Sequence, residues 1–159
     1  MSETLGLLYA DHFPYRQVET ARNVRQSPIH DRLKGEGACF GEVSGWERAN
    51  WFLPKAEHDA GKPVEYEYSW KRQNWFDHSA DEHNAVRNHV GMFDLSSFGK
   101  IRVVGKDAEA VLQRLCGNDV AVPDGKIVYT QFLNEDGHIE ADVTVTRLSS
   151  DEFLVVTPA

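Results

Sequence analysis

Asp142 is the residue of this 159-residue chain whose type and setting best suit chemistry. In segment 139–147, apolar Ile139, Ala141, Val143 and Val145 alternate with polar Glu140, Asp142, Thr144 and Thr146, the period of two that is typical of a strand. A carboxylate held on a rigid strand at a cavity wall can hydrogen-bond an amine, orient it, or stabilise a developing iminium cation. The competing interpretation is a polar sheet face turned to solvent.

Tyr129 lies on the strand expected just before Asp142 in the same hairpin. A tyrosine can offer its ring face to a flat heterocycle and its hydroxyl to the edge of that heterocycle. Ordinary packing within the sheet is the alternative interpretation. The two residues together therefore predict a small polar site on one hairpin.

Other kinds of site find no support in the sequence. The seven histidines include His78, His83 and His89 near one helix, but no HExxH pattern and no Cys/His cluster occurs, so we expect no metal. No GxSxG, Walker or GxGxxG motif is present, so this chain alone should bind neither FAD nor NAD. The aromatic segments 46–52 and 72–76 are typical of core or interface anchors.

The C-terminal half has the clearest elements. Segments 127–133 and 139–148 are rich in β-formers and are joined by the turn residues 134–138, which predicts a hairpin, and 153–157 begins a third strand. From Asp107, the apolar residues Ala108, Val111, Leu112 and Leu115 have helical spacing, and Gly117 ends that helix. These elements are expected to position Tyr129 and Asp142.

The N-terminal half is more mixed. Ser27 and Pro28 predict the start of a short helix that ends at Gly35 and Gly37. We expect a strand over 38–46 with a bend at Gly41, a loop and domain boundary within 47–63, and a strand over 64–70. A helix over 79–90 and an interrupted strand over 93–104 follow. The abrupt end of the last strand suggests a truncated domain.

Composition limits the class of protein. The chain is 41% hydrophobic and carries a net charge of −8, which is typical of a globular protein and argues against nucleic acid as a partner. No apolar segment is long enough to span a bilayer, and no signal peptide is evident. The two cysteines, Cys39 and Cys116, are far apart and form no CxxC motif, so we expect buried thiols in a reducing compartment.

Several segments resemble the sarcosine/dimethylglycine dehydrogenase family. Segments 25–33 and 41–52 are similar to the domain that connects to the FAD-binding oxidoreductase domain in that family. From Gln73 onward, the chain resembles the start of the folate-binding domain shared with the glycine-cleavage aminomethyltransferase (T-protein). The matching segments are 90–96, the helix and "NDV" turn of 105–120, and the hairpin segments 129–134 and 137–145.

The resemblance implies roles for individual residues. Asp142 matches the pterin-contacting carboxylate that orients the folate amine, and Tyr129 matches a folate-contacting tyrosine. Phe98 and Val103 fall near apolar residues that line the folate pocket, and Thr157 falls near a position that is often Asn in the aminomethyltransferases. His138 replaces a common second glycine of the hairpin.

The resemblance also implies a fold, a domain plan and a function. It implies an α+β fold with a mixed or antiparallel sheet and short helices, a connecting domain over 1–56, and the N-terminal part of the folate-binding domain over 64–159. The parent enzyme would use FAD to oxidise a sarcosine- or dimethylglycine-type amine and would pass the one-carbon unit to tetrahydrofolate. Its compartment would be the cytoplasm, or the mitochondrial matrix in a eukaryote.

Two other functions remain open at this point. The flavin domain and the later half of the folate domain are missing from the chain, so the flavin domain would come from the parent enzyme or from a separate subunit. The chain is therefore a fragment of a folate-dependent demethylating enzyme, a non-catalytic folate-binding or interaction module, or an inactive fragment that exposes hydrophobic surface.

Overall fold

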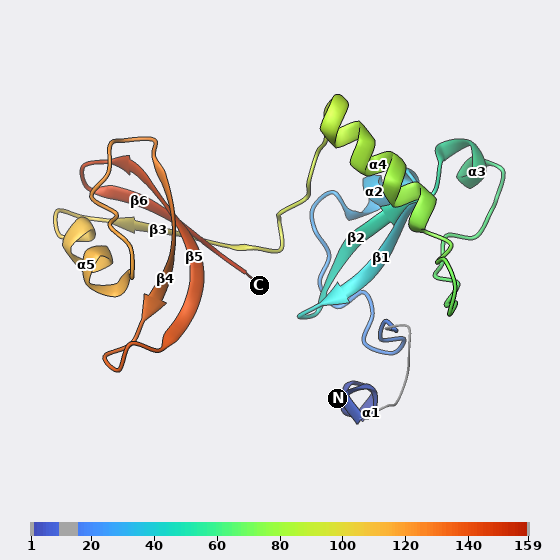
Figure 1. Ribbon diagram of the computed structural model, residues 1–159, viewed down its shortest axis with the longest axis horizontal. Helices are drawn as coiled ribbons and strands as arrows, with labels where there is room; N and C mark the ends of the chain where they lie inside the picture. The colour runs from blue at the N-terminus through green and yellow to red at the C-terminus, as the bar shows by residue number, and fades with distance from the viewer. Residues whose placement is uncertain (1, 10–15, 159) are drawn as a thin grey trace. The chain divides into compact units, whose positions relative to one another are not determined.

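The structure is a computed structural model that describes residues 2–9 and 16–158 (Figure 1). Its internal contacts divide the chain into two compact units, Met1–Ser96 and Ser97–Ala159. Both units combine antiparallel strands with short helices, which confirms the predicted α+β class. The boundary between the units lies after Ser96, whereas the domain plan of 1–56 and 64–159 concerns the parent family and stays a prediction.

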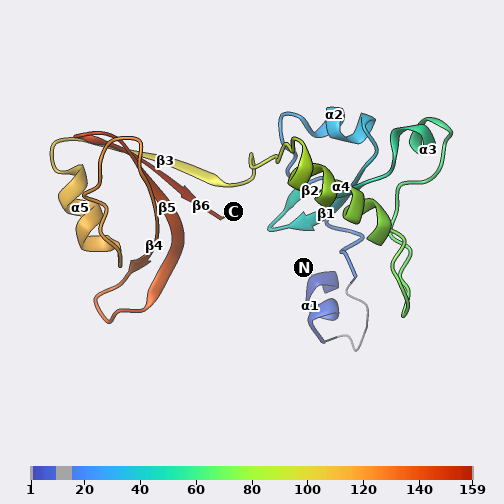
Figure 2. The same cartoon turned by 45° about the horizontal axis from the view of Figure 1, so that its top comes forward.

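The first unit is built on a two-stranded hairpin. Its elements are α1 (Ser2–Tyr9), α2 (His30–Gly35), β1 (Ala38–Val43), β2 (Trp46–Phe52), α3 (Lys55–Asp59) and α4 (Phe76–Asn88). The strands β1 and β2 pair antiparallel, and α4 contacts β2 (Figure 2). A small core of Cys39, Trp51 and Leu53 lies behind the hairpin, with Val64, Tyr66 and Trp75 packed against it.

Three predictions for this unit were wrong. The strand expected over 38–46 is a hairpin, because Ser44 and Gly45 both adopt positive φ and turn the chain. Part of the expected loop 47–63 is therefore strand β2 and helix α3. Residues 64–70 form no strand: alternate side chains such as Val64 and Tyr66 are partly buried, but the backbone pairs with no neighbouring strand.

The helix predictions for this unit largely hold. The short helix expected after Ser27 and Pro28 is α2, although its N-cap is Ile29 and no side chain caps it. The helix expected over 79–90 is α4, which begins earlier at Phe76 and ends at Asn88. The strand expected over 93–104 begins only at Gly99 and belongs to the second unit.

The second unit is a four-stranded antiparallel sheet covered on one face by a helix. Its elements are β3 (Gly99–Val104), α5 (Ala108–Leu115), β4 (Ile127–Leu133), β5 (Ile139–Ser149) and β6 (Glu152–Thr157), and the sheet order is β3-β6-β5-β4. In both views α5 lies on one side of this sheet (Figures 1 and 2). The predicted helix from Asp107, the hairpin and the third strand are all confirmed.

The core of the second unit lies between α5 and the inner face of the sheet. It consists of the buried residues Ala108, Leu112, Val120, Val128, Val143, Val145, Phe153 and Val155. The alternation predicted for β5 is correct from Ala141 to Val145, because Val143 and Val145 are 2% and 1% exposed while Asp142 is exposed, but Ile139 was placed wrongly on the buried face and is exposed. Burying one face of β4 and β5 fixes which side chains point outward, since a slip of one residue would reverse both faces.

Candidate functional site

Asp142 and Tyr129 lie together on the outer face of the hairpin formed by β4 and β5. In the register of this hairpin, Gln131 pairs with Asp142, and Tyr129 pairs with Thr144. Directly paired residues share one face of a sheet, and residues two apart on one strand also share it. The register therefore brings Tyr129, Gln131 and Asp142 side by side, and these three residues are called the hairpin site below.

The carboxylate of Asp142 is held by one hydrogen bond to each oxygen. The Tyr129 hydroxyl donates to Oδ2 at 3.0 Å, and the Gln131 side-chain amide donates to Oδ1 at 3.1 Å. A carboxylate oxygen accepts more than one hydrogen bond, so both oxygens keep acceptor capacity for a ligand. Because Asp142 is exposed and Tyr129 is 62% exposed, the carboxylate and the tyrosine ring are accessible from outside.

The hydrogen bond also affects the protonation of Tyr129. Donation to Asp142 raises the pKa of the Tyr129 hydroxyl, the negative charge of Asp142 and desolvation raise it further, and the Gln131 side chain opposes them. The phenol therefore stays protonated at neutral pH and remains a donor to the carboxylate. The arrangement can hold an amine N–H against Asp142 and stabilise positive charge that develops there.

The turn of residues 118–120, which follows α5, is hydrogen-bonded to β4. The backbone N–H of Asn118 donates to the Thr130 hydroxyl at 3.0 Å, and the Asn118 side chain donates to the Tyr129 carbonyl at 3.3 Å. The Gln113 side chain of α5 binds Asp119 and the backbone N–H of Val120. The "NDV" turn of 118–120 is thus a structural support for the strand that carries Tyr129.

The connection between the strands is equally well defined. The Asn134 side-chain oxygen accepts from the backbone N–H groups of Asp136 and His138, and Gly137 adopts a φ of +80°. The Asn134 backbone N–H donates to the His138 carbonyl at 3.0 Å and closes the hairpin, and the register shifts between Phe132 and Leu133, next to the turn. The turn lies outside the hairpin site.

The other predicted folate contacts lie elsewhere in the second unit. Val103 pairs with the fully buried Phe153 and packs against the inner core, on the face opposite the hairpin site. Thr157 pairs with Gly99, and Phe98 is half-buried just before β3. The structure therefore brings Tyr129 and Asp142 together but not Phe98, Val103 or Thr157, whose roles stay predictions.

Sequence reasoning missed Gln131. Gln131 is two residues after Tyr129 on the same strand, but a register shift between Phe132 and Leu133 is what sets it opposite Asp142. Only the register, and not the residue types, identifies it as the second donor to the carboxylate. The hairpin site is also more open than the cavity wall expected from the sequence, since the polar outer face is accessible.

The other groups that could form a site are possible metal ligands, the two cysteines and the cavities of the first unit. Among residues 2–9 and 16–158, no group of His, Cys, Asp or Glu side chains is arranged to hold a metal ion. Cys39 and Cys116 are free thiols, and burial raises the pKa of both, to about 11 for Cys39. Two described cavities, of about 540 and 310 Å³, are lined by first-unit residues. None of the helices described is long and apolar enough to cross a membrane.

The fold and the hairpin site define an aminomethyltransferase-like domain, and comparison with known proteins agrees. The family described as the GCVT N-terminal domain matches residues 29–159. The chain belongs to this family. A solved structure of the glycine cleavage system aminomethyltransferase T from Bartonella henselae superposes with a TM-score of 0.66 and 25% identity, over 86% of this chain and 32% of that one.

Relatives extend the match over the whole chain. The chain is 52% identical, over 99% of its length, to 4-methylaminobutanoate oxidase (formaldehyde-forming) from Paenarthrobacter nicotinovorans. It is 34% identical to human mitochondrial sarcosine dehydrogenase over 92% of its length, and 34% identical to a mouse mitochondrial pyruvate dehydrogenase phosphatase regulatory subunit over 98%. It spans only 18% of the length of each. The predicted membership in the sarcosine/dimethylglycine dehydrogenase family is confirmed.

Proposed function

We propose that the hairpin site contacts tetrahydrofolate and that the chain serves as part of the one-carbon transfer domain of a folate-dependent amine-demethylating enzyme. The observation that carries the proposal is the Asp142 carboxylate. It accepts hydrogen bonds from Tyr129 and Gln131 and still has acceptor capacity on an accessible face of the sheet. Membership in the GCVT N-terminal domain family supports the same function.

The residues fit the chemistry of a reduced folate. Its flat heterocycle carries N–H groups, which suit the free acceptor positions of Asp142. The exposed ring of Tyr129 can stack against a heterocycle while its hydroxyl stays hydrogen-bonded to the carboxylate. Asp142 would orient the folate amine and stabilise positive charge near the reacting nitrogens during transfer.

The oxidation step requires a partner. A flavin domain, in the parent enzyme or as a separate subunit, would oxidise the N-methyl group and supply the one-carbon unit that tetrahydrofolate accepts. This chain has no dinucleotide-binding fingerprint, so its own residues would bind and orient the folate only. The net charge of −8 argues against nucleic acid as a further partner, and we expect no membrane partner.

Titration calorimetry with tetrahydrofolate tests the proposal. We expect the wild-type chain to bind, and Asp142→Asn to bind about tenfold more weakly because one charge-assisted hydrogen bond is lost at an exposed site. Asp136→Asn, in the hairpin turn of the same unit, is the matched control and should bind like wild type. Equal affinities for all three chains would contradict the role of Asp142.

A second function is favoured by the similarity to the phosphatase regulatory subunit. In that case the chain would belong to a binding module that keeps the fold without turnover. Folate binding that depends on Asp142, with no folate-coupled product when the flavin domain and an N-methyl amine are supplied, would identify this function. Formation of 5,10-methylenetetrahydrofolate that falls in Asp142→Asn would identify the enzymatic one.

A further inference from the structure

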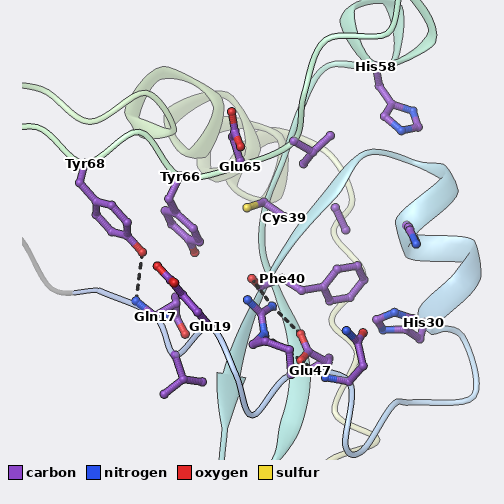
Figure 3. Close-up of a pocket in the computed structure, with 16 residues that line it drawn as sticks. Gln17, Glu19, His30, Cys39, Phe40, Glu47, His58, Glu65, Tyr66 and Tyr68 are labelled. Carbon is purple, nitrogen blue, oxygen red and sulfur yellow. Dashed lines mark hydrogen bonds and ion pairs between the residues drawn. The ribbon is translucent and has the colours of Figure 1, made fainter. Parts of the chain in front are cut away.

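The larger described cavity, of about 540 Å³, lies within the first unit (Figure 3). It is bounded by the segment 17–23, by α2, β1 and β2, and by the extended segment 64–68. Its volume falls in the range of cavities that bind small molecules. Nothing in the proposed function uses this cavity, which is called the first-unit cavity below.

A neutralised ion pair lines the cavity. The guanidinium of Arg22 donates to the Glu47 carboxylate at 2.9 and 2.6 Å, and the Glu47 side chain is only 1% exposed. The backbone N–H of Asn23 also donates to Glu47, and Arg22 donates to the Phe40 carbonyl. Because Arg22 and Glu47 satisfy each other, the charges that remain to recognise a ligand come from other residues.

One side of the cavity is acidic and aromatic. In Figure 3, Glu19 and Tyr68 lie on the side away from α2, next to Tyr66. The Tyr66 and Tyr68 rings stack with centroids 5.9 Å apart, and their hydroxyls accept hydrogen bonds from the Asn50 side chain and the Gln17 backbone. Glu19 forms no ion pair within residues 2–9 and 16–158. Carboxylate and aromatic rings together favour a methylated ammonium group.

The opposite side is basic. His30 and Lys34 lie one helical turn apart on α2, and His58 comes from α3; Figure 3 shows both histidines away from Glu19. His30 is 6% exposed and stacks on Phe40, yet its Nδ1 has no hydrogen-bond partner among the described residues; Nδ1 of His58 also makes no hydrogen bond, and the Asp59 carboxylate lies 3.8 Å from it. Unsatisfied buried polar atoms are uncommon, and this side of the cavity favours a carboxylate.

The two sides have opposite charge, and Cys39 and Glu47 lie between them (Figure 3). A ligand that is only a cation or only an anion would use one side and leave the other unmatched. We propose that the first-unit cavity binds a zwitterionic N-methyl amino acid, with its ammonium group toward Glu19 and the tyrosines and its carboxylate toward Lys34 and the histidines. The choice of an N-methyl amine rests on the proposed function, whereas the zwitterion requirement follows from the cavity.

Calorimetry with 4-methylaminobutanoate as the probe tests this inference on the full chain. We expect saturable binding, and much weaker binding of N-methylpropylamine and of butanoate, each of which carries one of the two charges. Glu19→Gln and Lys34→Met should each weaken binding about tenfold. The controls Glu36→Gln and Lys71→Met remove charges of the same kind outside the cavity and should bind like wild type.

The outcomes separate this inference from the proposed function. No saturable binding up to about 10 mM, equal binding of a single-charge probe, or unchanged affinity in both cavity variants would overturn the inference. Asp142→Asn should leave 4-methylaminobutanoate binding unchanged, because Asp142 does not line the cavity. Failure of the inference alone would leave the folate titration intact, and failure of the proposed function would appear only in the folate titration.

Discussion

Replacing Glu47 with glutamine should destabilise the first unit strongly. The Glu47 carboxylate accepts three hydrogen bonds, from Arg22 Nε at 2.9 Å, Arg22 Nη2 at 2.6 Å and the Asn23 backbone at 2.6 Å. Glutamine places an NH2 donor against one of these donors and leaves the Arg22 charge unpaired. Breaking a buried ion pair costs about 3–5 kcal/mol, and because the Arg22 side chain is 27% exposed, we expect about 2–4 kcal/mol.

The same variant should change the response to acid. The hydrogen bond from Arg22 lowers the pKa of Glu47 below its ordinary value of 4.5, and the Asn23 N–H and the Arg22 charge lower it further, whereas burial opposes them. A lowered pKa in the folded state gives stability that is present above pH 4.5 and is lost as the pH falls through the folded-state pKa. Glu47→Gln should lose this part of the acid dependence.

Urea unfolding followed by tryptophan fluorescence is the assay. All four tryptophans lie within the first unit, so their fluorescence follows that unit. Glu57→Gln removes one partner of an exposed ion pair with Lys62 in the same unit and is the matched control, with little expected effect. A Glu47→Gln midpoint equal to that of the control, with the acid dependence intact, would refute the reasoning.

Three further predictions concern other parts of the chain. Leu112→Ala should cost about 2–5 kcal/mol in the second unit, because Leu112 is 1% exposed in its core, and circular dichroism during urea unfolding measures the loss. Cys39 should stay unreactive toward a thiol reagent at pH 8, and its contribution to stability should be lost as the pH rises from its ordinary pKa of 9.0 through about 11, which alkaline unfolding measures. Asp142→Asn should lower the pKa of Tyr129 toward 10.0, which an ultraviolet titration with Tyr129→Phe as reference detects; an unchanged titration would contradict the hydrogen bond.

The second unit was predictable because its local signals agree with one another. Alternation in β5, turn residues at 134–138 and helical spacing from Ala108 all indicate the same fold. Asp142 and Tyr129 were therefore placed on the correct hairpin. The partnership with Gln131 was not foreseen, because it depends on the cross-strand register and not on the sequence of either strand alone.

The first unit was harder to predict because polar residues occupy its interior. Glu47 is buried in β2 beside Arg22, 25 residues earlier, which neutralises it. The prolines, glycine and charged residues of 54–63 made the whole segment 47–63 look like a loop, although its first part is this strand. Segment 64–70 shows the reverse case: Val64 and Tyr66 alternate as in a strand, but they pack on Trp51 and the core behind the hairpin without a ladder partner. In both segments, contacts between residues far apart in the sequence determine whether a strand forms. A local sequence pattern carries no information about such contacts.

A structure of the chain with tetrahydrofolate bound tests the central claim most directly. We expect the folate heterocycle on the outer face of β4 and β5, with an N–H group within hydrogen-bond distance of an Asp142 carboxylate oxygen and the ring against Tyr129. Tetrahydrofolate bound elsewhere, in the first-unit cavity for example, with the Asp142 carboxylate untouched, would contradict it.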